Sequence, residues 1–240
     1  MPVDAVNGRG ATETRRSWHL ALFALLAASL LGSLVRGYHD ALSARGNDLS
    51  IYLDAAQAVH QGESPFEVFG YLYLPVFAVF LAPLAWLPAW LAVGLWQVLS
   101  WAALLWSAKA CARLVGGRAA SPWIGWFALL ATWRLLDSNL SYGQANAFTL
   151  AAILASLEAA LAGRATRAGI WVGWATAFKI LPGILLLVYA LQRRWRAFWV
   201  GLAAFAVLAL LLPSIALGPK LALQTHQEWY AQVMHPFVEG

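Results

Sequence analysis

Long apolar stretches alternate with short polar segments along this chain of 240 residues. The first apolar stretch covers about residues 18–35. Six more follow, at residues 71–87, 90–107, 123–136, 145–161, 169–191 and 198–217. The stretches are continuous and rich in leucine and alanine, a pattern typical of helices that satisfy their own backbone polar groups. Because a helix needs roughly 20 residues to cross a bilayer, the pattern predicts an all-α fold, a polytopic transmembrane helical bundle with residues 1–240 in one membrane domain.

The longest polar interruption before the second apolar stretch, residues 36–70, concentrates acidic side chains. It holds five of the eleven acids in the chain, Asp40, Asp48, Asp54, Glu63 and Glu67. Within it, apolar residues recur at helical spacing over residues 48–61, and Gly62 and Pro65 follow as helix-ending residues. We therefore predict a loop with an amphipathic helix that lies along the membrane surface.

Composition supports a membrane protein. The chain is 61% hydrophobic and 11% charged, with a mean hydropathy of +0.64, which is more apolar material than one globular core can bury. The net charge of +5 comes from arginines beside apolar stretches, so it indicates membrane orientation and no nucleic-acid partner. The single cysteine, Cys111, excludes a disulfide within the chain and a thiolate metal cage, and no metal site or cofactor is predicted.

The arginines and lysines predict the orientation of the chain. Arg15 and Arg16 place residues 1–17 in the cytoplasm as a tail, so that residues 36–70 lie outside, and the end of the chain, residues 218–240, is predicted as an external polar segment. Three basic connections, around residues 109–118, 164–167 and 193–196, should all be cytoplasmic. If each of the six later stretches crossed the membrane once, the three connections could not all lie on the cytoplasmic side. We expect short re-entrant pieces at residues 74–88 and 179–182, where prolines interrupt the apolar pattern.

Lys179 lies ten residues into the apolar stretch 169–191. A lysine at mid-membrane costs about 2.5–3.5 kcal/mol on insertion scales, so a partner or a polar cavity must compensate it. Pro182 breaks the helix three residues later and frees carbonyl groups nearby. The alternative is that Lys179 simply extends its ammonium group to the membrane interface.

Two further polar sites have both structural and functional interpretations. Asp48 starts the predicted loop helix and is either its N-cap or a general base at the membrane surface, whereas Asp54 falls on the opposite helical face. The polar turn 137–146 contains Gln144 and Asn146, which can bind a ligand with many hydroxyl groups or form a turn in which Gly143 is the turn former.

Six short motifs occur in a fixed order. They are N-D-L-S-I-Y at residues 47–52, G-E-S-P-F at 62–66, Y-L-P at 73–75, P-L-A-W-L-P at 83–88, G-Q-A-N at 143–146 and K-I-L-P at 179–182. These motifs and their order along the chain, together with the arginine-rich residues 193–196, resemble those of glycosyltransferase family 87, also known as DUF2029. Leu74 departs from the family pattern, which often has a first proline there.

The resemblance implies a membrane glycosyltransferase of the GT-C type. Such an enzyme moves a hexosyl group, typically mannosyl, from a polyprenyl-phosphate sugar to a lipid or glycan acceptor on the non-cytoplasmic side. The expected location is a bacterial plasma membrane, as a multi-pass protein among membrane lipids. By this resemblance Asp48 takes the position of an essential aspartate and acts as the base, and the expected substrate-binding residues are Tyr52, Tyr73, Gln144, Asn146 and Lys179. The role of Lys179, offsetting the charge of the leaving phosphate, follows from its chemistry.

Two other functions remain open. A transporter or flippase is suggested by Lys179 beside a broken helix, although no inverted repeat is visible and the acids concentrate in a loop. Members of the resembled family usually continue for well over a hundred residues beyond the point where this chain stops. A shortened, inactive remnant is therefore the third hypothesis.

Overall fold

The computed structural model describes residues 24–25, 27–29, 31–40, 42–43, 47–117 and 122–236. All regular elements in these ranges are helices, which agrees with the predicted all-α class. Residues 31–40, at the end of the first predicted helix, are helical. The predicted tail 1–17, the beginning of the helix predicted at 18–35, Arg118 and residues 237–240 lie outside the described residues.

The labelled α-helices follow one another with short connections. They are α2 (Asp48–Gln61), α3 (Pro75–Leu81), α4 (Ala89–Gly116), α5 (Pro122–Ala131), α6 (Trp133–Ser141), α7 (Asn146–Leu161), α8 (Ala165–Phe178), α9 (Ile184–Leu191), α10 (Trp195–Ala206), α11 (Leu212–Leu217) and α12 (Pro219–Trp229). Tighter 3₁₀ turns are η1 (Pro65–Glu67), η2 (Ala82–Trp86) and η4 (Leu181–Gly183). Two π-helical segments, η5 (Val207–Leu211) and η6 (Tyr230–Met234), continue α10 and α12.

Local sequence explains where α2 begins and ends. The side chain of Asn47 accepts a hydrogen bond of 2.7 Å from the backbone N–H of Ser50, which caps the first turn. Gly62 ends the helix in the left-handed conformation, with φ of 77°. The helix predicted at residues 48–61 is confirmed with the same bounds.

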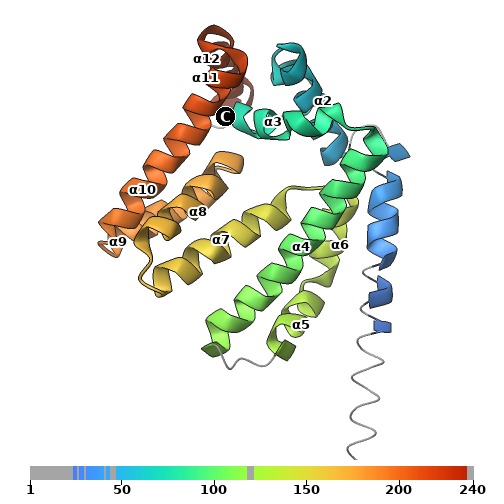
Figure 1. The fold of residues 1–240 in the computed structure, drawn as a ribbon, viewed down its shortest axis with the longest axis vertical. Coiled ribbons are helices and arrows are strands. Elements are labelled where there is room, and N and C mark those ends of the chain that lie inside the picture. Colours follow the sequence, from blue (N-terminus) through green and yellow to red (C-terminus); the bar gives the residue numbers. More distant parts are fainter. Residues whose placement is uncertain are drawn as a thin grey trace, which may run out of the picture.

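The helices form a bundle with a transverse layer at one end (Figure 1). α3 lies across this end between α2 and α12, and it contacts both helices. Below this layer, α8 packs against α7 and α10, and α7 packs against α4. The bundle thereby joins helices from both halves of the chain.

Within the described ranges, two helices are long and apolar enough to cross a membrane by length and composition. They are α4, with 28 residues, and the continuous helix of 23 residues from Trp195 to Leu217. Three other apolar segments form shorter helices, Pro75–Trp86, Asn146–Leu161 and Leu181–Leu191. The stretch predicted at residues 123–136 is interrupted at Thr132, between α5 and α6.

The arginine-rich connections lie together at one end of the bundle. Arg113 at the end of α4 lines a cavity with Arg164 and Arg167 at the start of α8. A second cavity lies between Gly163 and Ala165 on one side and the segment with Arg193, Arg194 and Arg196 on the other. The interruption of residues 169–191 at Lys179 allows this arrangement, because α8 and α9 form two arms that lead away from the arginine-rich end and back to it.

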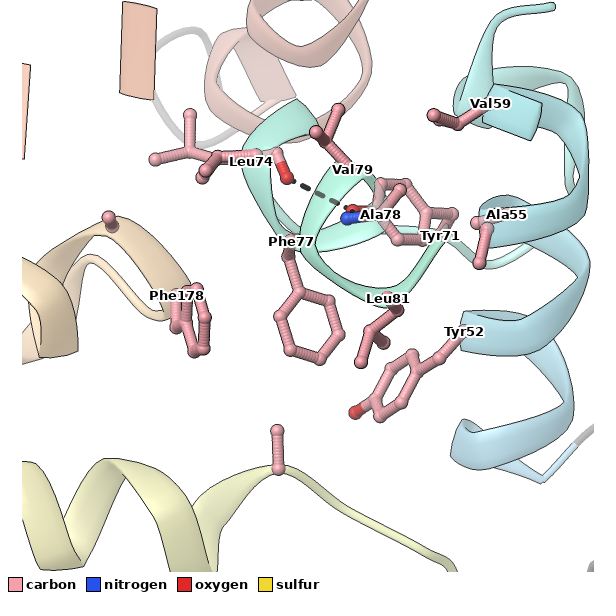
Figure 2. Packing of buried hydrophobic residues seen from close by; sticks show 14 of the residues in the cluster. Tyr52, Ala55, Val59, Tyr71, Leu74, Phe77, Ala78, Val79, Leu81 and Phe178 are labelled. Atoms are coloured by element: carbon pink, nitrogen blue, oxygen red, sulfur yellow. Dashed lines mark hydrogen bonds between the residues drawn. The ribbon is translucent and has the colours of Figure 1, made fainter. Parts of the chain in front are cut away.

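An aromatic core holds the transverse layer on the bundle (Figure 2). Phe77 of α3 packs edge-on against Tyr52 of α2, with ring centroids 4.9 Å apart, and against Phe178 of α8, at 5.4 Å. The buried hydroxyl of Tyr71 donates to the carbonyl of Leu74 and accepts from the N–H of Ala78, both at 3.0 Å. This hydroxyl therefore pairs two backbone groups at the beginning of α3.

His226 of α12 contacts the helix Trp195–Leu217 near Pro213. In an α-helix, the carbonyl of Ala209 would accept from the N–H of residue 213, but residue 213 is proline and has no N–H. The imidazole Nε2 of His226 in α12 lies 2.8 Å from this carbonyl. The other ring nitrogen, Nδ1, lies 2.6 Å from the carbonyl of Ala222. In the tautomer with its proton on Nε2, His226 donates to the Ala209 carbonyl, which has lost its α-helical donor.

Small residues allow α8 and α10 to approach closely. An added Cβ at Gly173 would lie 2.5 Å from the carbonyl oxygen of Gly201, and one at Gly169 would lie 2.6 Å from that of Ala197. Both pairs are four residues apart, the spacing of close helix–helix contacts in membranes. We predict that Gly173→Leu lowers the free energy of unfolding by about 1–3 kcal/mol through overpacking, measured as a lower Tm in detergent.

The matched control is Gly32→Leu, since nothing lies within 4 Å of a Cβ added at Gly32. This variant should keep the Tm of the unmodified chain. An equal loss of Tm in both variants would show that the close α8–α10 contact is not responsible.

Candidate functional site

The acidic end of α2 faces the polar turn before α7. Asp48 is partly buried in the first turn of α2, and its neighbour Asn47, not Asp48, provides the N-cap. The capping interpretation of Asp48 is therefore wrong. Its carboxylate forms no hydrogen bond or ion pair with the residues that the structure describes.

The electrostatic influence of Asp48 reaches three other predicted site residues. Its charge acts on Tyr52, Tyr73 and Lys179, so these side chains share one region with it. Asp54, in contrast, is exposed. The structure thus separates the two aspartates of α2, as the helical periodicity predicted.

Tyr52 and Tyr73 form a hydrogen-bonded pair beside Asp48. Their hydroxyl oxygens are 2.6 Å apart, and their rings meet edge to face with centroids 5.0 Å apart. Burial raises the pKa of both hydroxyls above the usual tyrosine value, and the Asp48 carboxylate adds to both shifts. Within the pair one hydroxyl donates to the other, so one of the two hydroxyl protons can be donated to a ligand.

A chain of amides leads from the polar turn to Lys179. Asn139 and Asn146 each donate to the side-chain oxygen of Gln144, at 2.9 and 2.8 Å. Lys179 in turn donates to the side-chain oxygen of Asn146. The ammonium group also lies 6.0 Å from the centre of the Tyr73 ring, which links the amide chain to the tyrosine pair.

Lys179 occupies the interruption between α8 and η4. Its backbone is extended and ends α8, because Pro182 lacks the N–H that would pair with the carbonyl of Phe178 in a continued helix. The side chain is partly buried, and one of its three donors is used by Asn146. Lys179 therefore has a specific partner, and no other hydrogen bond of its ammonium group is found within the described ranges.

A cavity of about 380 Å³ opens beside Lys179 and Tyr73. Its other walls are apolar and come from three parts of the chain, Leu72, Leu74, Phe178, Ile180, Trp229, Val233 and Met234. A single cation at the edge of an otherwise apolar cavity suits a ligand with an anionic head and a hydrocarbon body.

Two contacts in this region were not predicted. Asn139 belongs to the polar turn at residues 137–146, so its hydrogen bond to Gln144 could have been suspected from that cluster of amides. The hydrogen bond from Ser64 to Glu228 joins the loop after α2 to α12. No sequence signal indicated this second contact, because the two residues are separated by 164 positions.

Gly143 brings the polar turn against α2. Its φ is 66°, and an added Cβ would lie 2.5 Å from the Cβ of Leu49. The indole N–H of Trp96 donates to its carbonyl at 2.9 Å, and the N–H of Leu49 donates to Tyr142 at 3.3 Å. The predicted turn-forming role of Gly143 is confirmed, and this residue also determines how closely the polar turn approaches Leu49 in the first turn of α2.

We predict that Gly143→Ala lowers the free energy of unfolding by about 1–3 kcal/mol, because it combines left-handed strain with a collision. Gly62→Ala is the matched control, since Gly62 has φ of 77° but nothing within 4 Å of an added Cβ. Comparing the Tm values of both variants separates the cost of backbone strain, which both share, from the cost of the collision with Leu49, which only Gly143→Ala has. A Tm for Gly143→Ala no lower than that for Gly62→Ala would show that the contact with Leu49 adjusts without cost.

Sequence comparison gives relatives for most of the chain. Residues 71–238 match glycosyltransferase family 87, so the Asp48 segment lies before the matched region. Two curated relatives come from Mycobacterium tuberculosis (strain CDC 1551 / Oshkosh) and Mycolicibacterium smegmatis (strain ATCC 700084 / mc(2)155). Both are named polyprenol-phosphate-mannose-dependent alpha-(1-2)-phosphatidylinositol pentamannoside mannosyltransferase.

The first relative is 30% identical over 217 residues, which cover 84% of this chain and 47% of the relative. The second is 29% identical over 220 residues, with 85% of this chain and 52% of the relative covered. The chain thus spans about half the length of the curated relatives it matches. No solved structure matches it.

Proposed function

Because the chain belongs to glycosyltransferase family 87, we propose that it transfers a mannosyl group from polyprenyl-phosphate mannose to a lipid or glycan acceptor. The observation that carries this proposal is that Asp48 interacts electrostatically with the Tyr52–Tyr73 pair and with Lys179, and that Tyr73 and Lys179 line a largely apolar cavity. A base, neutral donors and a cation next to a hydrocarbon-lined space are the groups that such a reaction needs.

Asp48 is the proposed general base. The acceptor hydroxyl attacks the anomeric carbon of the mannosyl group, and its proton passes to the Asp48 carboxylate. The bond between the anomeric carbon and the phosphate oxygen breaks as the new glycosidic bond forms, and polyprenyl phosphate leaves with the bonding electrons. Its partly buried position and its electrostatic interaction with Tyr73 and Lys179 support this role.

Lys179 is the proposed partner of the leaving phosphate. Negative charge increases on the phosphate as the bond breaks, and a fixed ammonium group stabilises that charge more than it stabilises the intact donor. The hydrogen bond to Asn146 orients Lys179, while Gln144 and Asn139 fix Asn146 in turn. The apolar walls around Leu72 and Trp229 are suited to the first isoprene units of the carrier.

The distribution of charge supports a reaction on the non-cytoplasmic side of a bacterial plasma membrane. Trp96 of α4 contacts the polar turn, whereas Arg113 lies almost five turns further along the same helix, about 25 Å away. Positive-inside bias assigns the arginine-rich end to the cytoplasm, so the end with Asp48 faces outward. We further propose that the apolar helices form a multi-pass bundle of the GT-C type, with residues 36–70 and 218–240 as external segments of one membrane domain.

The direct test is transfer of radiolabelled mannose from polyprenyl-phosphate mannose to membrane lipid or glycan by membranes that contain the chain. Appearance of labelled product that depends on the chain and is insensitive to ion gradients is the expected result. Movement of the labelled donor across proteoliposomes without any product would instead identify a transporter and would contradict the proposal.

A further inference from the structure

The cavity lined by Arg113, Arg164 and Arg167 lies at the arginine-rich end of the bundle, between α4, α7 and α8. It has a volume of about 530 Å³. Glu158 is engaged by Arg113 through two hydrogen bonds of 2.6 and 3.1 Å. The side chains of Arg164 and Arg167 form no hydrogen bond or ion pair within the part of the chain that the structure describes. The cavity therefore has two positive charges in excess.

This polar cavity continues into an apolar one. A neighbouring space of about 420 Å³ shares Trp106, Ala155 and Trp171 with it. The further walls are aromatic, and Ala151 and Ala152 of α7 leave room between them. The two cavities thus form one groove along the helices, with arginines at its end and hydrocarbon walls along its length.

We propose that this groove binds an anionic phospholipid from the leaflet at the arginine-rich end. The phosphate lies between Arg164 and Arg167, because guanidinium groups present paired donors that match phosphate oxygens. One acyl chain lies against Trp106 and Trp171, over the alanines of α7. A water-soluble phosphate could use the arginines but would leave the apolar half empty, so the shape of the groove favours a lipid.

The phosphate of this lipid would lie apart from the residues of the proposed reaction. Arg113 is about 25 Å along α4 from Trp96, the residue that contacts the polar turn near Asp48. The apolar half of the groove extends along α7 to Phe148, whose ring packs against Trp96 with centroids 4.8 Å apart. The arginine-lined end is therefore the part of the groove that is separate from the candidate site.

The test uses native mass spectrometry of the full chain in a neutral detergent, with added dioleoyl phosphatidylglycerol or dioleoyl phosphatidylcholine. Phosphatidylglycerol should be retained preferentially, and Arg164→Gln combined with Arg167→Gln should weaken its binding by about 30-fold. The control removes two arginines at the same end but outside this groove, Arg193→Gln with Arg196→Gln. This control should bind phosphatidylglycerol as the unmodified chain does.

A third variant tests the apolar half of the groove. Ala155→Trp, at the junction of the two cavities, should also weaken lipid binding, whereas Leu150→Trp, on an exposed part of α7 outside both cavities, should not. Gel filtration identifies variants that remain folded. Equal retention of both lipids, equal weakening by the two arginine pairs, or a dimer that Ala155→Trp dissociates would overturn the proposal.

Discussion

Asp48→Asn is expected to reduce the rate of mannosyl transfer by about 10²–10⁴-fold, the usual contribution of a general base. Asparagine keeps the size and the hydrogen-bonding oxygen of the side chain but cannot accept the proton of the acceptor hydroxyl. Because Asn47 rather than Asp48 caps α2, the substitution leaves the helix start intact. Initial rates at saturating donor and acceptor measure the effect, with Tm as a check on folding.

The same helix provides the control for this substitution. Asp54 is exposed and carries the same functional group, so Asp54→Asn should retain the rate of the unmodified chain. Unchanged transfer by Asp48→Asn, or an equal loss in both variants, would remove Asp48 as the base. The comparison also accounts for any general effect of one lost negative charge at this end of the molecule.

Lys179→Met is expected to lower transfer by about 10²–10³-fold, comparable to the loss of one electrostatic contact to the charge that develops in a transition state. Methionine keeps most of the aliphatic length but removes the ammonium group that would stabilise the leaving phosphate. The loss should appear in kcat more than in KM for the donor, because the phosphate gains charge only as the bond breaks.

Lys220 is suited to control for this effect, since it is an exposed lysine at the start of α12. Lys220→Met should transfer mannose at the normal rate. The kcat–KM comparison also separates catalysis from structure, because a purely structural Lys179 would lower Tm and the amount of active protein without lowering kcat per active site. An unaltered kcat in correctly folded Lys179→Met would contradict the proposed phosphate contact.

Local sequence was sufficient to predict the helix that carries Asp48. Its apolar positions repeat at helical spacing, and Gly62 ends it at the predicted place. The identity of the cap could not be decided in the same way, because Asn47 and Asp48 are both good capping residues and only the backbone geometry distinguishes them. The exposed position of Asp54 followed from the helical period alone.

Hydropathy was less informative about whether an apolar stretch forms one uninterrupted helix. The stretch at residues 123–136 is apolar except for Thr132 and Arg134 and was predicted as one segment, yet the helix is interrupted at Thr132. Pro182, in contrast, correctly indicated the interruption at Lys179, because a proline removes a specific backbone donor. The sequence thus predicted the interruption that a proline causes. It did not predict the interruption at Thr132, where no proline is present.

The polar residues of the candidate site were predictable as individuals but not as a network. Gln144, Asn146 and Lys179 were identified from motifs, whereas their order of hydrogen bonding depends on how α7 and α8 pack. Asn139 was not identified, although its amide completes the chain. Side-chain partners that are distant in sequence require the three-dimensional arrangement.

The contact between His226 and the carbonyl of Ala209 makes two distant residues mutually dependent. Pro213 alone would leave a buried acceptor unpaired, which is costly. His226 alone would compete for an oxygen already in use by the helix. Selection should therefore retain or replace the proline and the imidazole together, as a single compensated unit, even though one lies in an apolar helix and the other in the polar segment that follows.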